Sequence, residues 1–152
     1  MKMFCPEFKH GEPIPSRYTC DGEDISVSIG WLDIPENTKS LALIMDDPEA
    51  HNGTWVHWLV YNMPPTRKAL PSACPNDATL DDGSLQGLNS WGRTGYGGPC
   101  PPIGRHRYFF KLYALDTVLE LSGKPTKPAL EAAMQGHVIE QAQLLGTYLK
   151  SR

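Results

Sequence analysis

Long hydrophobic runs are absent from this sequence of 152 residues. No stretch approaches the ~20 apolar residues of a membrane-spanning helix, and the N-terminal MKMFCPEFKHGEP lacks the apolar centre of a secretory signal. The sequence therefore predicts no membrane span and a soluble, cytoplasmic protein.

Clustered positive charge is also absent. The 14 Lys and Arg residues are scattered along the chain, and together with 17 Asp and Glu they give a formal net charge of −3. Proteins that bind nucleic acids or anionic membranes usually carry a basic patch or stripe. We therefore expect neither as a partner.

Cysteines at metal-binding spacing are missing as well. Cys5, Cys20, Cys74 and Cys100 form no C-x-x-C pair, and a chain of this length does not need a disulfide framework. We therefore expect free thiols, no metal site and no cofactor. A zinc site built from Cys20, Cys74, Cys100 and a histidine is the lesser alternative.

The common catalytic motifs are not found. The chain has no G-x-S-x-G elbow, no phosphate-binding G-x-x-x-x-G-K-[ST] loop and no H-E-x-x-H helix. Two enzyme alternatives stay open: Cys100 as a nucleophile beside His106, and Asp47 with His57 as the acid/base pair of a hydrolase. Neither brings a nucleophile and an oxyanion hole together, so a non-enzymatic role is favoured.

Proline and glycine, by contrast, are abundant, with 14 of each. They interrupt the first two thirds of the chain so often that helices there must be short. The runs between them, at 39–47, 54–64 and 107–116, are apolar or aromatic and end at turn or charge signals, which is typical of strands.

The last part of the chain has a different pattern. Its apolar residues recur at spacings of four and seven, as in Leu130, Met134, Val138, Leu145 and Leu149. This spacing is typical of a helix with one buried face, and Gly136 favours a break into two helices. The sequence therefore predicts a single, mostly β domain over residues 1–152, with one or two C-terminal helices packed on a sheet.

Acidic residues end the first of these strands. Asp46 and Asp47 follow a largely apolar run and precede Pro48. Because successive side chains of a strand point to opposite faces, only one of the two carboxylates can face a given site.

The other two strands each pair a histidine with an aromatic residue. Trp55 and His57 lie two positions apart, as do His106 and Tyr108, so the members of each pair share a strand face. The Gly- and Pro-rich stretch GGPCPPIG leads directly into the second pair. These features predict one site at the strand ends.

A small anion suits these side chains. A carboxylate close to an imidazole raises the pKa of the histidine, which predicts that His57 and His106 are charged donors. Tyr108 adds a hydroxyl donor, and Gly97 and Gly98 allow backbone N–H groups to approach an oxyanion closely. The predicted ligand is phosphate or a phosphorylated head group.

These motifs together resemble those of the phosphatidylethanolamine-binding protein family, in its bacterial Raf-kinase-inhibitor-like branch. The resemblance runs from about residue 5 to the C-terminus, through YTCDGEDIS, KSLALIMDDPEA, TWVHWLVYNMP, GYGGPCPPIGRHRYFFKLYALD and AMQGHVIEQAQLLGTY. It implies a large central antiparallel sheet, a smaller flanking sheet, C-terminal helices and an anion pocket at one end. Some eukaryotic members inhibit kinases, so regulation of a protein partner is a hypothesis, as is a homodimer.

Motif by motif, the resemblance assigns ligand-binding positions to Asp47, Glu49, Trp55, His57, Gly98, Cys100, Pro101, His106 and Tyr108. The chain departs from the family pattern at His51, where a proline is usual. We expect a trans peptide bond there. We also carry the hypothesis that the His51 ring enters the pocket.

Overall fold

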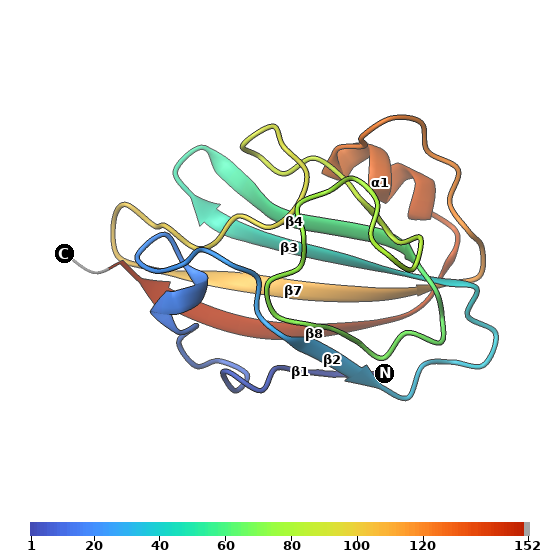
Figure 1. The fold of residues 1–152 in the computed structure, drawn as a ribbon, viewed down its shortest axis with the longest axis horizontal. Coiled ribbons are helices and arrows are strands. Elements are labelled where there is room, and N and C mark those ends of the chain that lie inside the picture. Colours follow the sequence, from blue (N-terminus) through green and yellow to red (C-terminus); the bar gives the residue numbers. More distant parts are fainter. Residues whose placement is uncertain (151–152) are drawn as a thin grey trace.

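A five-stranded antiparallel sheet forms the centre of the molecule (Figure 1), with the strand order β6-β4-β3-β7-β8. The structure is a computed structural model that describes residues 1–150. The strands of this sheet are β3 (Ser40–Ala50), β4 (Gly53–Met63), β6 (Leu85–Gln86), β7 (Arg105–Leu115) and β8 (Val138–Leu149). The long strands run side by side across the whole molecule.

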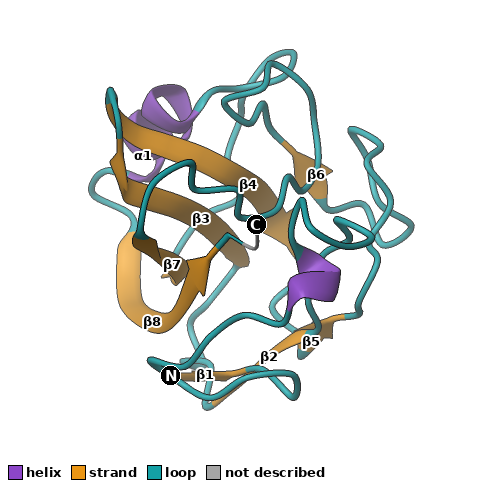
Figure 2. Cartoon of the chain, turned by 90° about the vertical axis from the view of Figure 1, so that its left-hand side faces the viewer, coloured by secondary structure: helices purple, strands orange, loops and turns teal. Residues whose placement is uncertain are grey.

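A smaller antiparallel sheet flanks the central one. It consists of β1 (Lys2–Phe4), β2 (Ile29–Leu32) and β5 (Ala69–Leu70). A short 3-10 helix, η1 (Ser16–Tyr18), and one α-helix, α1 (Lys127–Met134), complete the regular structure. Figure 2 shows α1 and the small sheet on opposite sides of the central sheet. The predicted mostly β fold with a large and a small sheet is confirmed.

Both faces of the central sheet are covered. One face packs toward the small sheet, in a cluster that includes Leu43 of β3 and Trp31 of β2. The opposite face carries Ile44 and packs against Leu130 and Met134 of α1. This explains why the central strands read as continuous apolar runs, since strands buried on both faces do not alternate with polar residues. Within residues 1–150, no helix is long and apolar enough to cross a membrane.

The prediction for the C-terminal region is only half right. Residues 127–134 are helical, but residues 138–149 form strand β8, which pairs with β7 along nearly its whole length. Gly136, with φ of 84°, lies in the turn between them. A spacing of four residues fits one face of a strand as well as one face of a helix, so the pattern did not discriminate. The buried residues of β8 instead alternate with period two: Leu144, Gly146 and Tyr148.

Candidate functional site

A cavity of about 340 Å³ lies where β3 ends and where β4 and β7 begin. Antiparallel pairing brings the C-terminal part of β3 and the start of β4 together, with Asp47 opposite Trp55. The loop 97–104 leads into β7 and forms one wall. The lining residues are Asp47, Ala50, Trp55, His57, Trp91, Cys100, Pro101, Pro102, His106 and Tyr108.

The two successive carboxylates do face opposite sides of the sheet. Asp46 is 1% exposed and faces the helix side, where its Oδ2 accepts from Lys111 Nζ at 3.3 Å and from Lys127 Nζ at 2.8 Å. Asp47 lines the cavity. The prediction that only one of them faces the site is confirmed.

Asp47 is paired with His106. His106 Nδ1 lies 2.7 Å from Asp47 Oδ2, while Asp47 Oδ1 accepts the backbone N–H of Glu49 at 2.8 Å. His106 Nε2 lies 3.1 Å from the carbonyl oxygen of Ile103. Both ring nitrogens thus face acceptors. The buried carboxylate of Asp47 therefore has the His106 ring as its side-chain partner at the cavity wall.

His57 has a different environment and is uncharged. It is 3% exposed, and its Nδ1 lies 2.6 Å from the carbonyl oxygen of Gly97. Burial lowers the pKa of His57 to about 4 and outweighs the opposite effects of the Gly97 hydrogen bond and the Asp47 charge. The expectation that a nearby carboxylate makes His57 a charged donor is therefore wrong.

Tyr108 closes the floor of the cavity. Its ring meets the His57 ring edge-on, with centroids 5.2 Å apart at 88°. Its hydroxyl has no hydrogen-bond partner within residues 1–150. Burial raises the pKa of Tyr108, so the hydroxyl keeps its proton and remains a donor.

Two indole rings form the outer wall. Trp55 and Trp91 are 38% and 43% exposed, and their rings meet edge-on at 5.5 Å. Trp91 also contacts the His57 ring at 5.2 Å. A Cβ at Gly97 would lie 2.2 Å from the Trp91 ring, so this glycine is what lets the indole close over the loop. No sequence motif places Trp91 at the site, and it is not among the residues predicted to line it.

The glycines of the loop do not present their N–H groups to the cavity. The Gly97 N–H donates to the His57 carbonyl at 3.0 Å, and the Gly98 N–H donates to Asp24 Oδ1 at 2.7 Å. A Cβ at Gly98 would lie 2.4 Å from the Tyr18 carbonyl oxygen. The expectation of an anion nest at these glycines is wrong, because the loop uses both donors to hold itself in place.

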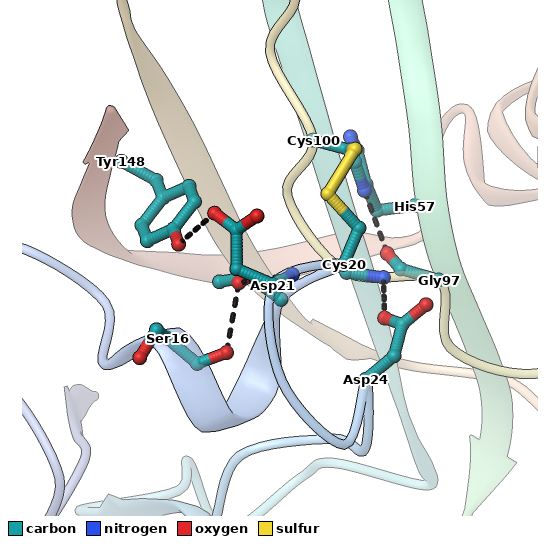
Figure 3. The surroundings of a disulfide bond; sticks show 10 residues. Ser16, Cys20, Asp21, Asp24, His57, Gly97, Cys100 and Tyr148 are labelled. Atoms are coloured by element: carbon teal, nitrogen blue, oxygen red, sulfur yellow. Dashed lines mark hydrogen bonds between the residues drawn. A yellow bond between two sulfur atoms is a disulfide. The ribbon is translucent and has the colours of Figure 1, made fainter. Parts of the chain in front are cut away.

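Cys100 is joined to Cys20 by a disulfide at the edge of the cavity (Figure 3). The expectation of free thiols is therefore wrong for these two residues and right for Cys5 and Cys74. Bonded sulfur is neither a nucleophile nor a zinc ligand, so both alternatives that relied on Cys100 fail in this state. The pairing joins two turn-rich loops 80 residues apart, and connectivity of this kind is not encoded in local spacing.

Hydrogen bonds reinforce the disulfide between the same two loops. The backbone N–H of Cys20 donates to the Pro99 carbonyl at 3.1 Å, and the Tyr96 hydroxyl donates to the Tyr18 carbonyl at 2.7 Å. Figure 3 shows the disulfide beside the His57 and Gly97 pair. The disulfide and these hydrogen bonds therefore hold the proline-rich wall of the cavity in place.

Two other acidic or basic candidates lie outside the cavity. Glu49 accepts from the backbone N–H and from Nε of Arg107 at 2.8 and 3.1 Å, and this pairing lowers the pKa of Glu49. His51 is exposed and lines a separate surface depression with Asn52. Its peptide bonds are trans, as expected, but the hypothesis that its ring enters the cavity is wrong.

The structure thus brings most of the predicted site residues together. Asp47, Trp55, His57, Cys100, Pro101, His106 and Tyr108 line one cavity. Glu49 and Gly98 lie next to the lining residues, where Glu49 accepts from Arg107 and the Gly98 N–H donates to Asp24. In residues 1–150, His, Cys, Asp and Glu side chains form no group of three or more that is arranged to hold a metal ion.

Comparisons with known proteins place the chain in a family. A family model described as phosphatidylethanolamine-binding protein matches residues 5–149. The chain is 53% identical to a UPF0098 protein of Methanothermobacter thermautotrophicus over 135 residues, which covers 89% of each chain. It is 48% identical to a UPF0098 protein of Aquifex aeolicus, covering 97% of this chain and 88% of that one.

Solved structures show the same fold. The phosphatidylethanolamine-binding protein homologue CT736 of Chlamydia trachomatis superposes with a TM-score of 0.91 at 41% identity, covering 99% of this chain and 97% of that chain. YbcL of E. coli, described as a member of the mammalian family, gives a TM-score of 0.91 at 31% identity, with 99% and 98% covered.

Proposed function

Because the chain belongs to the phosphatidylethanolamine-binding protein family, we propose that it binds a small oxyanion, phosphate or a phosphorylated head group, in the cavity at the end of the central sheet. One observation carries the proposal. Polar side-chain atoms at the floor of the cavity, the Tyr108 hydroxyl and the His57 ring, are left without a protein partner for at least one hydrogen-bonding position. Because both positions open onto the cavity, a polar ligand can complete their hydrogen bonds.

Within residues 1–150, the cavity holds no unpaired negative charge that would repel an anionic ligand. The Asp47 carboxylate is paired with His106 at 2.7 Å and accepts the Glu49 N–H. A lone buried carboxylate would repel an anion, but this one is compensated by the ring that holds it. The Tyr108 hydroxyl supplies a donor, and the rings of Trp55 and Trp91 line one side of the cavity.

Binding rather than catalysis suits these side chains. Among the residues of 1–150 that line the cavity, none is Ser, Thr or Lys, and Cys100 is tied up in the disulfide. Asp47 pairs with His106 and not with His57, which separates the acid/base pair considered for a hydrolase. Turnover of phosphoesters or acyl esters that disappears in His57→Ala would favour the hydrolase instead.

The exposed Trp55 and Trp91 at the cavity wall are the proposed contact surface for a regulated protein partner, such as a kinase, or for a second copy of the chain. A partner bound there would sense the ligand. The disulfide bears directly on the predicted cytoplasmic location, because disulfides persist in oxidising compartments and, among cytosols, in that of hyperthermophiles.

Calorimetric titration with inorganic phosphate and O-phosphorylethanolamine tests the proposal. We expect His57→Ala to weaken binding at least tenfold, and Tyr108→Phe, which keeps the ring and removes only the hydroxyl, to weaken it about fivefold or more. His51→Ala is the matched control, because this histidine is exposed and lies outside the cavity. Undiminished affinity in both cavity variants would show that the site is wrongly placed.

A further inference from the structure

The neutral ring of His57 presents a lone pair to the cavity. A backbone carbonyl can only accept, so the 2.6 Å contact with the Gly97 oxygen puts the single ring proton on Nδ1. Nε2 has no partner within residues 1–150, and the side chain lines the cavity. Whatever binds beside Nε2 therefore meets an acceptor.

The fold holds this ring in one orientation. Trp91 and Tyr108 contact it edge-on, each with centroids 5.2 Å away. The Gly97 N–H donates to the His57 carbonyl at 3.0 Å. His57 and Gly97 are therefore joined by two hydrogen bonds, one through the backbone of His57 and one through its ring. A flipped ring would lose the Nδ1 hydrogen bond inside a buried site, which is unfavourable.

The charged and titratable groups around His57 leave no cation free. On β3, Asp47 faces the cavity and is paired with His106 of β7, while Tyr108 of β7 keeps its proton. Asp46 lies on the opposite face with its lysines. From the loop side come the Gly97 carbonyl and the disulfide, which do not titrate. No Lys or Arg is among the lining residues within 1–150.

Resting on the proposed function, we infer that the cavity selects the singly protonated form of a phosphate monoester, whose P–OH group donates to Nε2 of His57. The ligand then carries one negative charge. Its hydroxyl proton meets the lone pair of Nε2, and its other oxygens accept from the Tyr108 hydroxyl. The dianion would bring a second charge into a cavity that has no free cation among residues 1–150, and would set two lone pairs against each other.

This specificity separates ligands of similar shape. A sulfate monoester or a phosphate diester carries one charge but no acidic proton, so its oxygen faces the Nε2 lone pair without a hydrogen between them. The second pKa of a phosphate monoester is about 6. Above that pH a bound monoester must take one proton from solution, and no bond other than the O–H bond forms or breaks.

Calorimetric titration of the wild-type protein from pH 5 to 8.5 is the direct test. With O-phosphorylethanolamine we expect constant affinity below pH 6 and a tenfold loss per pH unit above about 6.5. At pH 8, paired buffers of different ionisation enthalpy should report uptake of about one proton per ligand. A sulfate monoester, which is singly charged but has no acidic proton, should bind at least tenfold more weakly at pH 5.5 and gain affinity only toward pH 4, where His57 itself becomes protonated.

The variants separate His57 from a general charge effect. In His57→Ala, which removes the acceptor, the loss of affinity with rising pH should become shallower, whereas Tyr108→Phe should weaken binding with the same slope as wild type. Binding that is independent of pH, or a sulfate monoester that binds as tightly as the phosphate monoester, would overturn the inference and leave the proposed function standing. Absence of phosphate binding at every pH would overturn both.

Discussion

At the scale of single residues, burial decides the charge of each histidine in the cavity. His57 is 3% exposed and neutral, although Asp47 lies nearby. Both ring nitrogens of His106 lie against acceptors, and one of these acceptors is the Asp47 carboxylate. The two rings therefore have different roles: His57 offers an acceptor to the cavity, and His106 holds the Asp47 carboxylate.

The depressed pKa of His57 predicts a loss of stability in mild acid. An unfolded chain protonates this ring near pH 6.5, whereas the folded protein does so only near pH 4. The unfolded state thus binds more protons between these values, so the free energy of unfolding should fall by roughly 3 kcal/mol as the pH drops from 6.5 to 4. Above pH 6.5 this contribution is complete. Urea unfolding at several pH values measures it.

His57→Gln removes the titration and keeps a side-chain N–H for the Gly97 carbonyl. Its unfolding free energy should change less with pH than that of wild type over the same range. His51→Gln, at the exposed histidine, should retain the wild-type pH dependence. Parallel curves for wild type and His57→Gln would mean that His57 is not held neutral by the fold.

At the scale of elements, a buried ion pair attaches helix α1 to the central sheet. Asp46 of β3 accepts from Lys127, the first residue of the helix, and from Lys111 of β7. Asp46 is 1% exposed, and its Oδ1 has no partner within residues 1–150. The cluster fixes where the helix begins on the sheet.

Asp46→Asn should destabilise the fold without affecting the cavity. Removing the acid leaves two lysines facing each other, but both are partly exposed and can turn toward water, so we expect a loss of about 1–3 kcal/mol. Phosphate affinity should be unchanged because Asp46 faces the other side of the sheet. Asp116→Asn, which breaks an exposed pair with His137, is the control and should change stability by less than about 0.5 kcal/mol. A loss below that value in Asp46→Asn would contradict the anchoring role.

The same elements show how far sequence patterns reach. The strands 40–50, 53–63 and 105–115 were predictable because long apolar runs between turn residues have few other folds. Side chains of a strand alternate between its two faces, and this alternation predicted which residues share the cavity face. They are Asp47, Trp55, His57, His106 and Tyr108. The C-terminal strand was missed because residues four apart share a face in both a helix and a strand.

At the scale of the whole molecule, the features that escaped prediction are contacts between distant segments. The neutral state of His57 depends on how deeply β4 is buried. The availability of the Gly97 and Gly98 donors depends on Asp24 and on the His57 carbonyl. The Cys20–Cys100 bond likewise joins segments that only the finished fold brings together. Local sequence places the side chains on the correct face, and tertiary structure decides their chemistry.

The disulfide should contribute to the stability of the whole fold and to the shape of the cavity. It closes a loop with a sequence separation of 80 residues, and constraint of the unfolded chain predicts a loss of roughly 2–4 kcal/mol on reduction. Cys100 lines the cavity, so reduction or the double variant Cys20→Ser/Cys100→Ser should also weaken phosphate binding by freeing the loop. Urea unfolding and calorimetry, each with and without dithiothreitol, measure the two effects.

A thiol count shows whether the bond is present in the sample used. The denatured, unreduced chain should expose the two free thiols of Cys5 and Cys74, and reduction should release those of Cys20 and Cys100 as well. The count requires denaturation because burial raises the pKa of Cys5 to about 11 and keeps its thiol unreactive in the fold. Cys74→Ser is the matched control, and its stability should respond to dithiothreitol as wild type does. A protein with the bond formed that loses neither stability nor affinity on reduction would show that the hydrogen bonds from Cys20 and Gly98 hold the loop by themselves.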